Sequence, residues 1–217
     1  MTESLPGLHA AVLVGGAVRP SRRLRAALAD VGLVVAADGG LRHATKLGLT
    51  PDLLVGDLDS VDDETLARYP GLATERHGRD KDALDLELAL DAAEARGARR
   101  ITVVGGLSGR LDQTLATVLV AHARHAAGID VAVLDGRRAL WPLRVGETRE
   151  LPLSPGELFS LLALDARIEV SVAGSRFDLG RAVLQRAAGR GVSNEALGPV
   201  RVTAHAGALV AVAPGSD

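Results

Sequence analysis

The chain has 217 residues, of which 47% are hydrophobic and 24% are charged, and its formal net charge is −2. Such a composition is typical of a globular protein with a sizeable core, and the near-neutral charge argues against a protein that binds nucleic acid or membrane surfaces through bulk positive charge. The absence of cysteine excludes disulfides, thiol nucleophiles and cysteine-held zinc.

The amino-terminal residues and the aromatic content narrow the class further. The sequence Met-Thr-Glu-Ser-Leu-Pro lacks the positive charge of a signal peptide, and no apolar run reaches the roughly 18 residues of a membrane span. Aromatic residues make up 2% of the chain, which disfavours a base-stacking surface for single strands. We therefore expect a cytoplasmic protein with neither membrane nor nucleic acid as a partner.

The first part of the chain alternates between short apolar runs and amphipathic stretches of helical length. The predicted strands are residues 10–14, 33–37, 53–55, 101–104 and 131–134. The predicted helices are residues 22–30, 41–47, 62–68, 82–96 and 112–126. Buried strands alternating with helices predict an α/β domain over residues 1–137, with a Rossmann-like parallel sheet and helices on both faces.

The pattern changes after about residue 145, where short strand-like runs are separated by Gly, Pro, Ser and Asp. The predicted strands here are residues 148–153, 158–164, 168–172, 200–204 and 209–213. Residues 181–188 suggest a helical turn, and residues 136–144 are interpreted as a linker. These features predict a small all-β sandwich or barrel over residues 145–217.

Acidic residues directly follow two of the predicted strands. Asp38 ends one, and Asp57 and Asp59 end the next. In an open parallel sheet the carboxyl ends of the strands form one edge, so these side chains are expected to meet there. Clustered carboxylates favour Mg²⁺ held together with substrate phosphates. The alternative is that Asp57 and Asp59 shape a turn and Ser60 caps the next helix.

A glycine-rich loop joins the strand 101–104 to the helix that follows it. Glycine N–H groups can approach phosphate oxygens closely, and Arg110 can bind them bidentately. The alternative is a tight turn in which Asp112 caps the helix. The loop does not match the P-loop, and the glycines after the first strand, Gly15 and Gly16, do not match the dinucleotide-binding fingerprint.

A third polar segment opens the predicted helix 82–96. Asp82 and Asp85 lie three residues apart on one helical face, and Lys81 precedes them. The alternative is that these acids only complement the helix dipole. The histidines form no metal-binding pattern and are interpreted as surface or structural residues: His9, His43, His77, His122, His125 and His205.

Taken in order, these segments resemble the thiamine pyrophosphokinase (thiamine diphosphokinase) family. The matching motifs are Ala-Asp38-Gly-Gly, Pro51-Asp52-Leu-Leu-Val-Gly56-Asp57-Leu-Asp59-Ser60, Lys81-Asp82-x-x-Asp85 and Gly105-Gly106-x-x-Gly109-Arg110-x-Asp112-Gln113. The second half also resembles the family, in its Phe159, Phe177 and Gly191-Val-Ser193-Asn194 elements. The similarity covers almost the whole chain.

The resemblance implies an Mg²⁺-dependent transferase (kinase) of thiamine diphosphate biosynthesis, which transfers pyrophosphate from ATP to the hydroxyl of thiamine and releases AMP. It also implies a homodimer whose sites are shared between the α/β half of one subunit and the β half of the other.

The roles that the resemblance assigns fall into four groups. The catalytic residues would be Asp57, Asp59, Asp82 and Asp85. The Mg²⁺ ligands would be Asp57, Asp59 and Asp85. The nucleotide would be bound by Asp38, Gly39, Gly105, Gly106, Gly109, Arg110, Asp112 and Gln113. The thiamine site would include Lys81, Asp82, Ser193 and Asn194.

The sequence departs from the family pattern at two positions. Leu84 replaces a common threonine before Asp85, and Ala196 lies where many members carry an aromatic residue shortly after Ser-Asn. Two alternatives to thiamine pyrophosphorylation therefore remain: a pyrophosphokinase for another heterocyclic alcohol, and a catalytically weak thiamine- or nucleotide-binding regulator.

Overall fold

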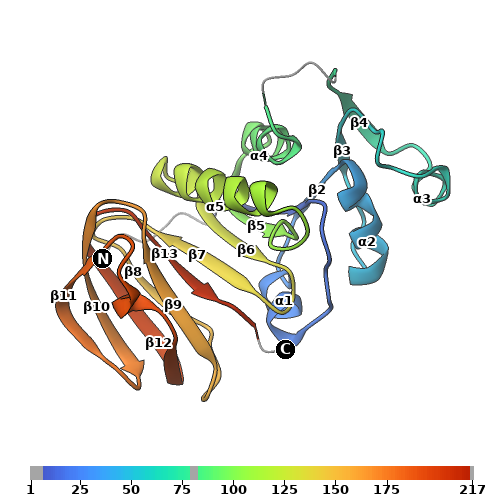
Figure 1. Cartoon of the computed structure of the whole chain (residues 1–217). Helices are drawn as coiled ribbons and strands as arrows, with labels where there is room; N and C mark the ends of the chain where they lie inside the picture. The colour runs from blue at the N-terminus through green and yellow to red at the C-terminus, as the bar shows by residue number, and fades with distance from the viewer. Residues whose placement is uncertain (1–6, 79–82, 216–217) are drawn as a thin grey trace. The chain divides into compact units, whose positions relative to one another are not determined.

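The protein is a mixed α/β chain with parallel and antiparallel strands (Figure 1). The computed structural model describes residues 7–78 and 83–215. These residues form two compact units. Unit 1 extends to Val120 and includes Gly128–Gly136, whereas unit 2 comprises Ala121–Ala127 and the chain from Arg137 onward.

Unit 1 contains a fully parallel sheet with the strand order β6-β5-β1-β2-β3-β4. Its strands are β1 (Leu8–Leu13), β2 (Leu33–Ala37), β3 (Leu53–Gly56), β4 (Ala73–Arg76), β5 (Ala98–Val104) and β6 (Asp130–Leu134). The middle strands β2 and β3 are buried at every position, which explains why they are continuous apolar runs in the sequence. The predicted strands of this unit are therefore confirmed.

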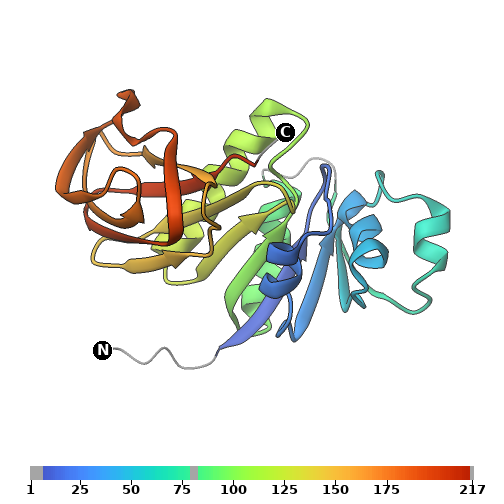
Figure 2. The same ribbon diagram turned by 90° about the horizontal axis from the view of Figure 1, so that it is seen from below.

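The helices of the first part of the chain connect these strands. They are α1 (Arg22–Ala27), α2 (Arg42–Leu47), α3 (Asp63–Ala67), α4 (Asp85–Ala95) and α5 (Leu111–Ala126), with a 3₁₀ turn η1 (Asp38–Leu41) before α2. Helix α4 packs against β1, β2, β3 and β5. Both views show β4 and α3 at the outer edge of unit 1 (Figure 1 and Figure 2). The edge strand β4 is largely exposed and lacks an apolar pattern, so the sequence did not predict it.

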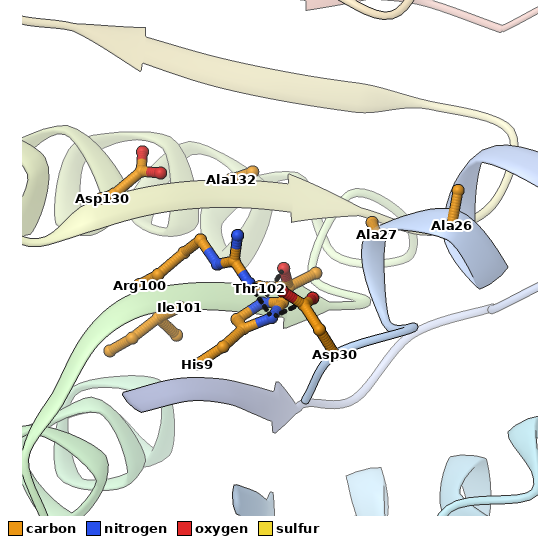
Figure 3. Close-up of a pocket in the computed structure, with 9 residues that line it drawn as sticks. All are labelled: His9, Ala26, Ala27, Asp30, Arg100, Ile101, Thr102, Asp130 and Ala132. Atoms are coloured by element: carbon orange, nitrogen blue, oxygen red, sulfur yellow. Dashed lines mark hydrogen bonds and ion pairs between the residues drawn. The ribbon is translucent and has the colours of Figure 1, made fainter. Parts of the chain in front are cut away.

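A polar cluster lies near the amino ends of β1, β5 and β6 (Figure 3). The buried imidazole of His9 bonds Asp30 through Nδ1 (2.9 Å) and the Thr102 hydroxyl through Nε2 (3.0 Å). Arg100 pairs with Asp30 as well. Burial lowers the pKa of His9, and Arg100 adds to this effect against the opposing influence of Asp30. His9 therefore has the structural role expected from its sequence context.

Unit 2 contains antiparallel strands in the order β11-β10-β12-β9-β13-β7, with β8 also paired to β12. The strands are β7 (Ala139–Leu143), β8 (Thr148–Leu151), β9 (Leu158–Ala163), β10 (Arg167–Ser175), β11 (Leu179–Gln185), β12 (Asn194–Ala206) and β13 (Leu209–Ala213). A 3₁₀ turn η2 (Gly189–Gly191) precedes β12.

Two predictions for this part of the chain are wrong. The expected linker 136–144 contains β7, whose five residues are all buried and pair with β13. The expected helical turn 181–188 overlaps β11, which pairs with β10. In both cases tertiary pairing overrides a local sequence without strict alternation of apolar residues.

A hydrogen bond between His125 and Glu147 stabilises unit 2. His125 is fully buried, and its Nε2 lies 2.6 Å from Glu147. Burial alone would raise the pKa of Glu147, but hydrogen bonds with His125 and the Arg144 N–H, together with the charge of Arg149, lower it to about 2.

Across residues 7–78 and 83–215, no helix combines the length and the apolar character that crossing a bilayer requires.

Candidate functional site

A cleft of about 300 Å³ lies at the carboxyl ends of the strands of unit 1. Its lining residues follow four different strands: Gly15 follows β1, Asp38 follows β2, Ser60 follows β3 and Gly106 follows β5. In parallel βαβ units each crossover helix begins at this same edge, so the first turns of helices also meet here. Asp85 of α4 accordingly lines the cleft.

The floor of the cleft is formed where the chain order of the strands reverses, between β1 and β5. The Gly106 N–H donates to the Gly15 carbonyl (3.0 Å), and the Ala17 N–H donates to the Ser108 hydroxyl (2.8 Å). Gly105 has φ +105°, and a Cβ at this position would lie 2.6 Å from the Val14 carbonyl oxygen. Glycine is therefore required for the two loops to touch. Open α/β sheets bind ligands at such a point of reversal.

Asp38 adopts an unusual conformation beside this floor. Its φ is +43°, in the left-handed region, and its side chain is buried. The carboxylate lies directly over Gly56, where a Cβ would be only 1.9 Å from Asp38 Oδ1. Oδ1 accepts a hydrogen bond from the Leu58 N–H (2.9 Å). Strained backbone of this kind is frequent at functional sites.

Three carboxyl groups lie close enough to influence one another. Burial raises the pKa of Asp38 to about 6, and a hydrogen bond with Asp85 and the charges of Asp85 and Asp57 contribute to this rise, whereas the Leu58 N–H opposes it. When protonated, the Asp38 carboxyl can donate this hydrogen bond to Asp85. A hydrogen-bond donor or a cation placed between them would relieve their repulsion.

The same acids determine whether a divalent cation fits. Within residues 7–78 and 83–215, no three acidic or histidine side chains converge into a complete metal site. Mg²⁺ usually takes only one or two protein carboxylates and completes its shell with water and substrate phosphates. The repelling pair Asp38 and Asp85, with Asp57 nearby, provides this type of donor set.

The structure brings together part of the predicted site. Among the predicted residues, those that line the cleft are Asp38, Gly39, Asp85, Gly106 and Gln113. Asp57 is half-buried, and its charge contributes to the raised pKa of Asp38. Its Oδ1 accepts a hydrogen bond from the backbone N–H of the exposed Asp59 (3.0 Å). Lys81 and Asp82 lie outside the described residues, and α4 begins at Asp85.

The glycine loop differs from the expectation in two respects. The Gly105 and Gly106 N–H groups already donate to the Leu134 and Gly15 carbonyls, so the idea that they point toward phosphates is wrong in this structure. Arg110 forms a bidentate pair with Asp112 (3.1 and 2.5 Å) on the exposed surface, and Gly109 lies beside this pair. Asp112 is not the helix cap either, because α5 begins at Leu111.

Sequence reasoning missed other residues of the cleft. Arg42, at the start of α2, brings a positive charge to a lining that contains Asp38 and Asp85. Its position four residues after Asp38 was the signal in the sequence that could have placed Arg42 near the same strand end. The interpretation of Ser60 as a helix cap is wrong, because Asp62 caps α3 and the Ser60 hydroxyl accepts from the Gly39 N–H (2.9 Å). Thr117 and Ser108 also line the cleft.

Ser193 and Asn194 line a second cavity, of about 680 Å³, in unit 2. Ser193 has φ +60°, and its N–H donates to the Ser160 hydroxyl (3.1 Å). The side-chain amide of Asn194 is bonded on both its oxygen and its nitrogen to neighbouring protein groups. Phe159 and Phe177 contribute aromatic surface to the same cavity.

Comparison with known proteins adds independent findings. Residues 24–133 match the family model described as thiamin pyrophosphokinase, catalytic domain. The search of curated proteins gives no match.

Solved structures with the same fold include thiamine pyrophosphokinase from Bacillus subtilis, with a TM-score of 0.83 and 20% identity over 96% of this chain and 99% of that one. Thiamin pyrophosphokinase from Geobacillus thermodenitrificans has a TM-score of 0.77 and 22% identity over 97% and 98% of the two chains. Thiamin pyrophosphokinase from Candida albicans has a TM-score of 0.75 and 13% identity over 95% and 88%.

The electrostatics of Asp38 predict the effect of one substitution. Because its pKa of about 6 lies above the ordinary 3.8, the folded state binds the proton more tightly than the unfolded chain. This contribution is fully present at low pH and is lost as the pH rises through 6, a difference of up to about 3 kcal/mol. Without added metal, Asp38→Asn should therefore raise the thermal midpoint at pH 7.5, and the gain should shrink toward pH 4.

Asparagine also tolerates the left-handed φ and can still accept from the Leu58 N–H, so the substitution leaves the local fold intact. The matched control is Asp63→Asn, an exposed acid in the first turn of α3, which should not raise the midpoint. A lower midpoint for Asp38→Asn at pH 7.5 would contradict the assignment of a repelling acid pair.

Proposed function

Because this chain belongs to the thiamin pyrophosphokinase family and carries its catalytic domain, we propose that it transfers the pyrophosphoryl group of ATP to the hydroxyl of thiamine with the help of Mg²⁺. The family makes the chain a thiamine diphosphokinase, an enzyme of thiamine diphosphate formation. The nucleotide, the metal and the residue roles are part of the proposal.

The observation that carries the proposal is the acid cluster of Asp38, Asp57 and Asp85 at the point of strand reversal. A triphosphate placed in the cleft would lie beside these acids and beside the positive charge of Arg42. Asp38, Gly39, Gly106 and Gln113 would line the nucleotide site, with Gly105 keeping the loop close to β1. Arg110 would break its pair with Asp112 and bind the phosphates instead.

Asp57, Asp59 and Asp85 would hold Mg²⁺. The carboxylate of Asp38 beside them would add to the negative charge that attracts the cation. When bound, Mg²⁺ supplies charge neutralisation for the phosphates. The chain itself would contribute position and electrostatics, as in other phosphoryl transfers. The acceptor hydroxyl would give its proton to a nearby carboxylate as its oxygen forms a bond to the β-phosphorus. The bond from this phosphorus to the oxygen that bridges it to the α-phosphorus would break, and AMP would leave with that oxygen. Lys81 and Asp82 are proposed near the reacting groups.

For the acceptor we propose the cavity of Ser193 and Asn194, and for the working unit a homodimer. The catalytic α/β part, residues 1–137, of one subunit would then face the thiamine-binding β part, residues 145–217, of its partner. A small β unit has limited core of its own, so contact with a second subunit would add stability.

The first prediction concerns the products. If the β-phosphorus is attacked, AMP and thiamine diphosphate must form in equal amounts from ATP and thiamine. Quantification of both products by chromatography over the first turnovers tests this. ADP together with thiamine monophosphate would contradict pyrophosphoryl transfer, and failure of thiamine while another heterocyclic alcohol reacts would contradict the acceptor.

A second prediction concerns the metal-binding acids. Asp57→Asn should lower the rate of AMP formation on the order of 100-fold or more, because a carboxylate that neutralises transferring phosphate is lost. The control Asp63→Asn removes an exposed acid a few residues away and should keep a near-normal rate. Equal rates for the two variants would show that Asp57 has no such role.

A third prediction concerns shared sites. Asp57→Asn and Ser193→Trp are each expected to be inactive, and after random subunit exchange half of the dimers carry one of each. If sites are shared, every mixed dimer has one undamaged site and about a quarter of the wild-type activity returns. If each site lies within one chain, no activity returns. Mass-tagged subunits verify that exchange has occurred.

A further inference from the structure

The turn between β10 and β11 holds an aromatic ring at the second cavity. Phe177 lies in this turn, lines the cavity and is 63% exposed. An exposed ring contributes little to folding through burial. Its position therefore calls for another explanation.

The backbone of Phe177 is fixed from both sides by a single side chain. Asn194 Oδ1 accepts from the Phe177 N–H (3.2 Å), and Asn194 Nδ2 donates to the Phe177 carbonyl (2.9 Å). The same Nδ2 donates to the Ser175 hydroxyl (3.1 Å), and Oδ1 also accepts from the Glu195 N–H (2.9 Å). The amide of Asn194 is thus used in holding the turn.

Neighbouring bonds make the turn more rigid. Asp178 Oδ1 accepts from the Ser175 N–H (2.9 Å) and hydroxyl (3.0 Å). The Arg176 N–H donates to the Glu195 carbonyl (2.8 Å), and the Arg176 guanidinium lies over the Phe177 ring, 5.8 Å from its centre. A rigid backbone that presents an exposed aromatic ring to a cavity is what ligand recognition requires.

The charges around the cavity indicate which kind of ring it accepts. Arg176 and Arg190 both line it, and Asp178 is the acidic residue beside them. Arg176 is paired with Glu195 (3.2 Å). With Arg176 paired and Asp178 offsetting Arg190, the lining has no net negative charge that would attract a cationic ring, so a neutral heteroaromatic ring fits better. Thiamine carries one neutral ring, the aminopyrimidine, and one cationic ring, the thiazolium.

We propose that Phe177 determines acceptor specificity by stacking against the neutral heteroaromatic ring of the acceptor alcohol, and that Asn194 is a positioning residue that acts through Phe177. This inference rests on the proposed function, because it takes the second cavity as the acceptor site. It also gives this chain an aromatic contact although Ala196 is small and fully buried.

The test compares steady-state constants of the full-length protein with thiamine and ATP. Phe177→Ala should raise KM for thiamine about tenfold and affect KM for ATP much less, because one stacking contact is lost. Phe177→Trp should restore a low KM for thiamine. Leu197→Ala is the matched control, since Leu197 is equally exposed at 63% on β12 and does not line the cavity.

A double-mutant cycle tests the role of Asn194. If Asn194 acts through Phe177, Asn194→Ala should also raise KM for thiamine, and adding it to Phe177→Ala should cause little further change. Thermal unfolding of each variant verifies that the chain is folded, and Asn194→Asp, which keeps the two acceptor bonds and loses the donor bonds, provides an intermediate case. Additive effects would overturn the positioning role.

The outcomes separate this inference from the proposed function. If the wild-type protein forms thiamine diphosphate and Phe177→Ala keeps KM for thiamine within twofold, the inference is overturned while the function stands. If the wild-type protein forms no thiamine diphosphate, the proposed function fails and the inference fails with it.

Discussion

The repulsion among Asp38, Asp57 and Asp85 is the constraint on which the candidate catalytic site depends. Three acids are brought to one sheet edge, and Asp38 is held over Gly56 in a left-handed conformation. Burial and neighbouring charge keep its pKa near 6, so the ligand-free site carries an electrostatic strain at neutral pH. The fold tolerates this strain because the neighbouring strands β2 and β3 are buried at every position and paired along their length.

The second cavity is organised by hydrogen bonds rather than by repulsion. Asn194 there satisfies four neighbouring groups and leaves Phe177 exposed. The two sites therefore prepare for ligands in different ways: the first by mutually repelling negative charges, the second by a rigid aromatic surface. A phosphate-bearing nucleotide with its cation suits the first, and a neutral heteroaromatic ring suits the second.

The sequence predicts the central architecture well because buried parallel strands are continuous apolar runs. It predicts the edge at which Asp38 lies for the same reason, since Asp38 directly follows the buried strand β2. The sequence does not reveal β4 or β7, whose existence depends on pairing with β3 and β13 rather than on their own pattern. The pairing of Arg110 with Asp112 and the use of the Asn194 amide are equally invisible in sequence, because both depend on side-chain geometry.

The response of folding stability to Mg²⁺ tests the central claim most directly. Thermal midpoints of the wild-type protein and of Asp57→Asn should be measured across a Mg²⁺ titration without nucleotide, at constant ionic strength. We expect that Mg²⁺ raises the wild-type midpoint, because a cation relieves the repulsion among the acids, and that the rise is largely lost in Asp57→Asn. An equal rise in both proteins, or no rise in the wild type, would contradict this expectation.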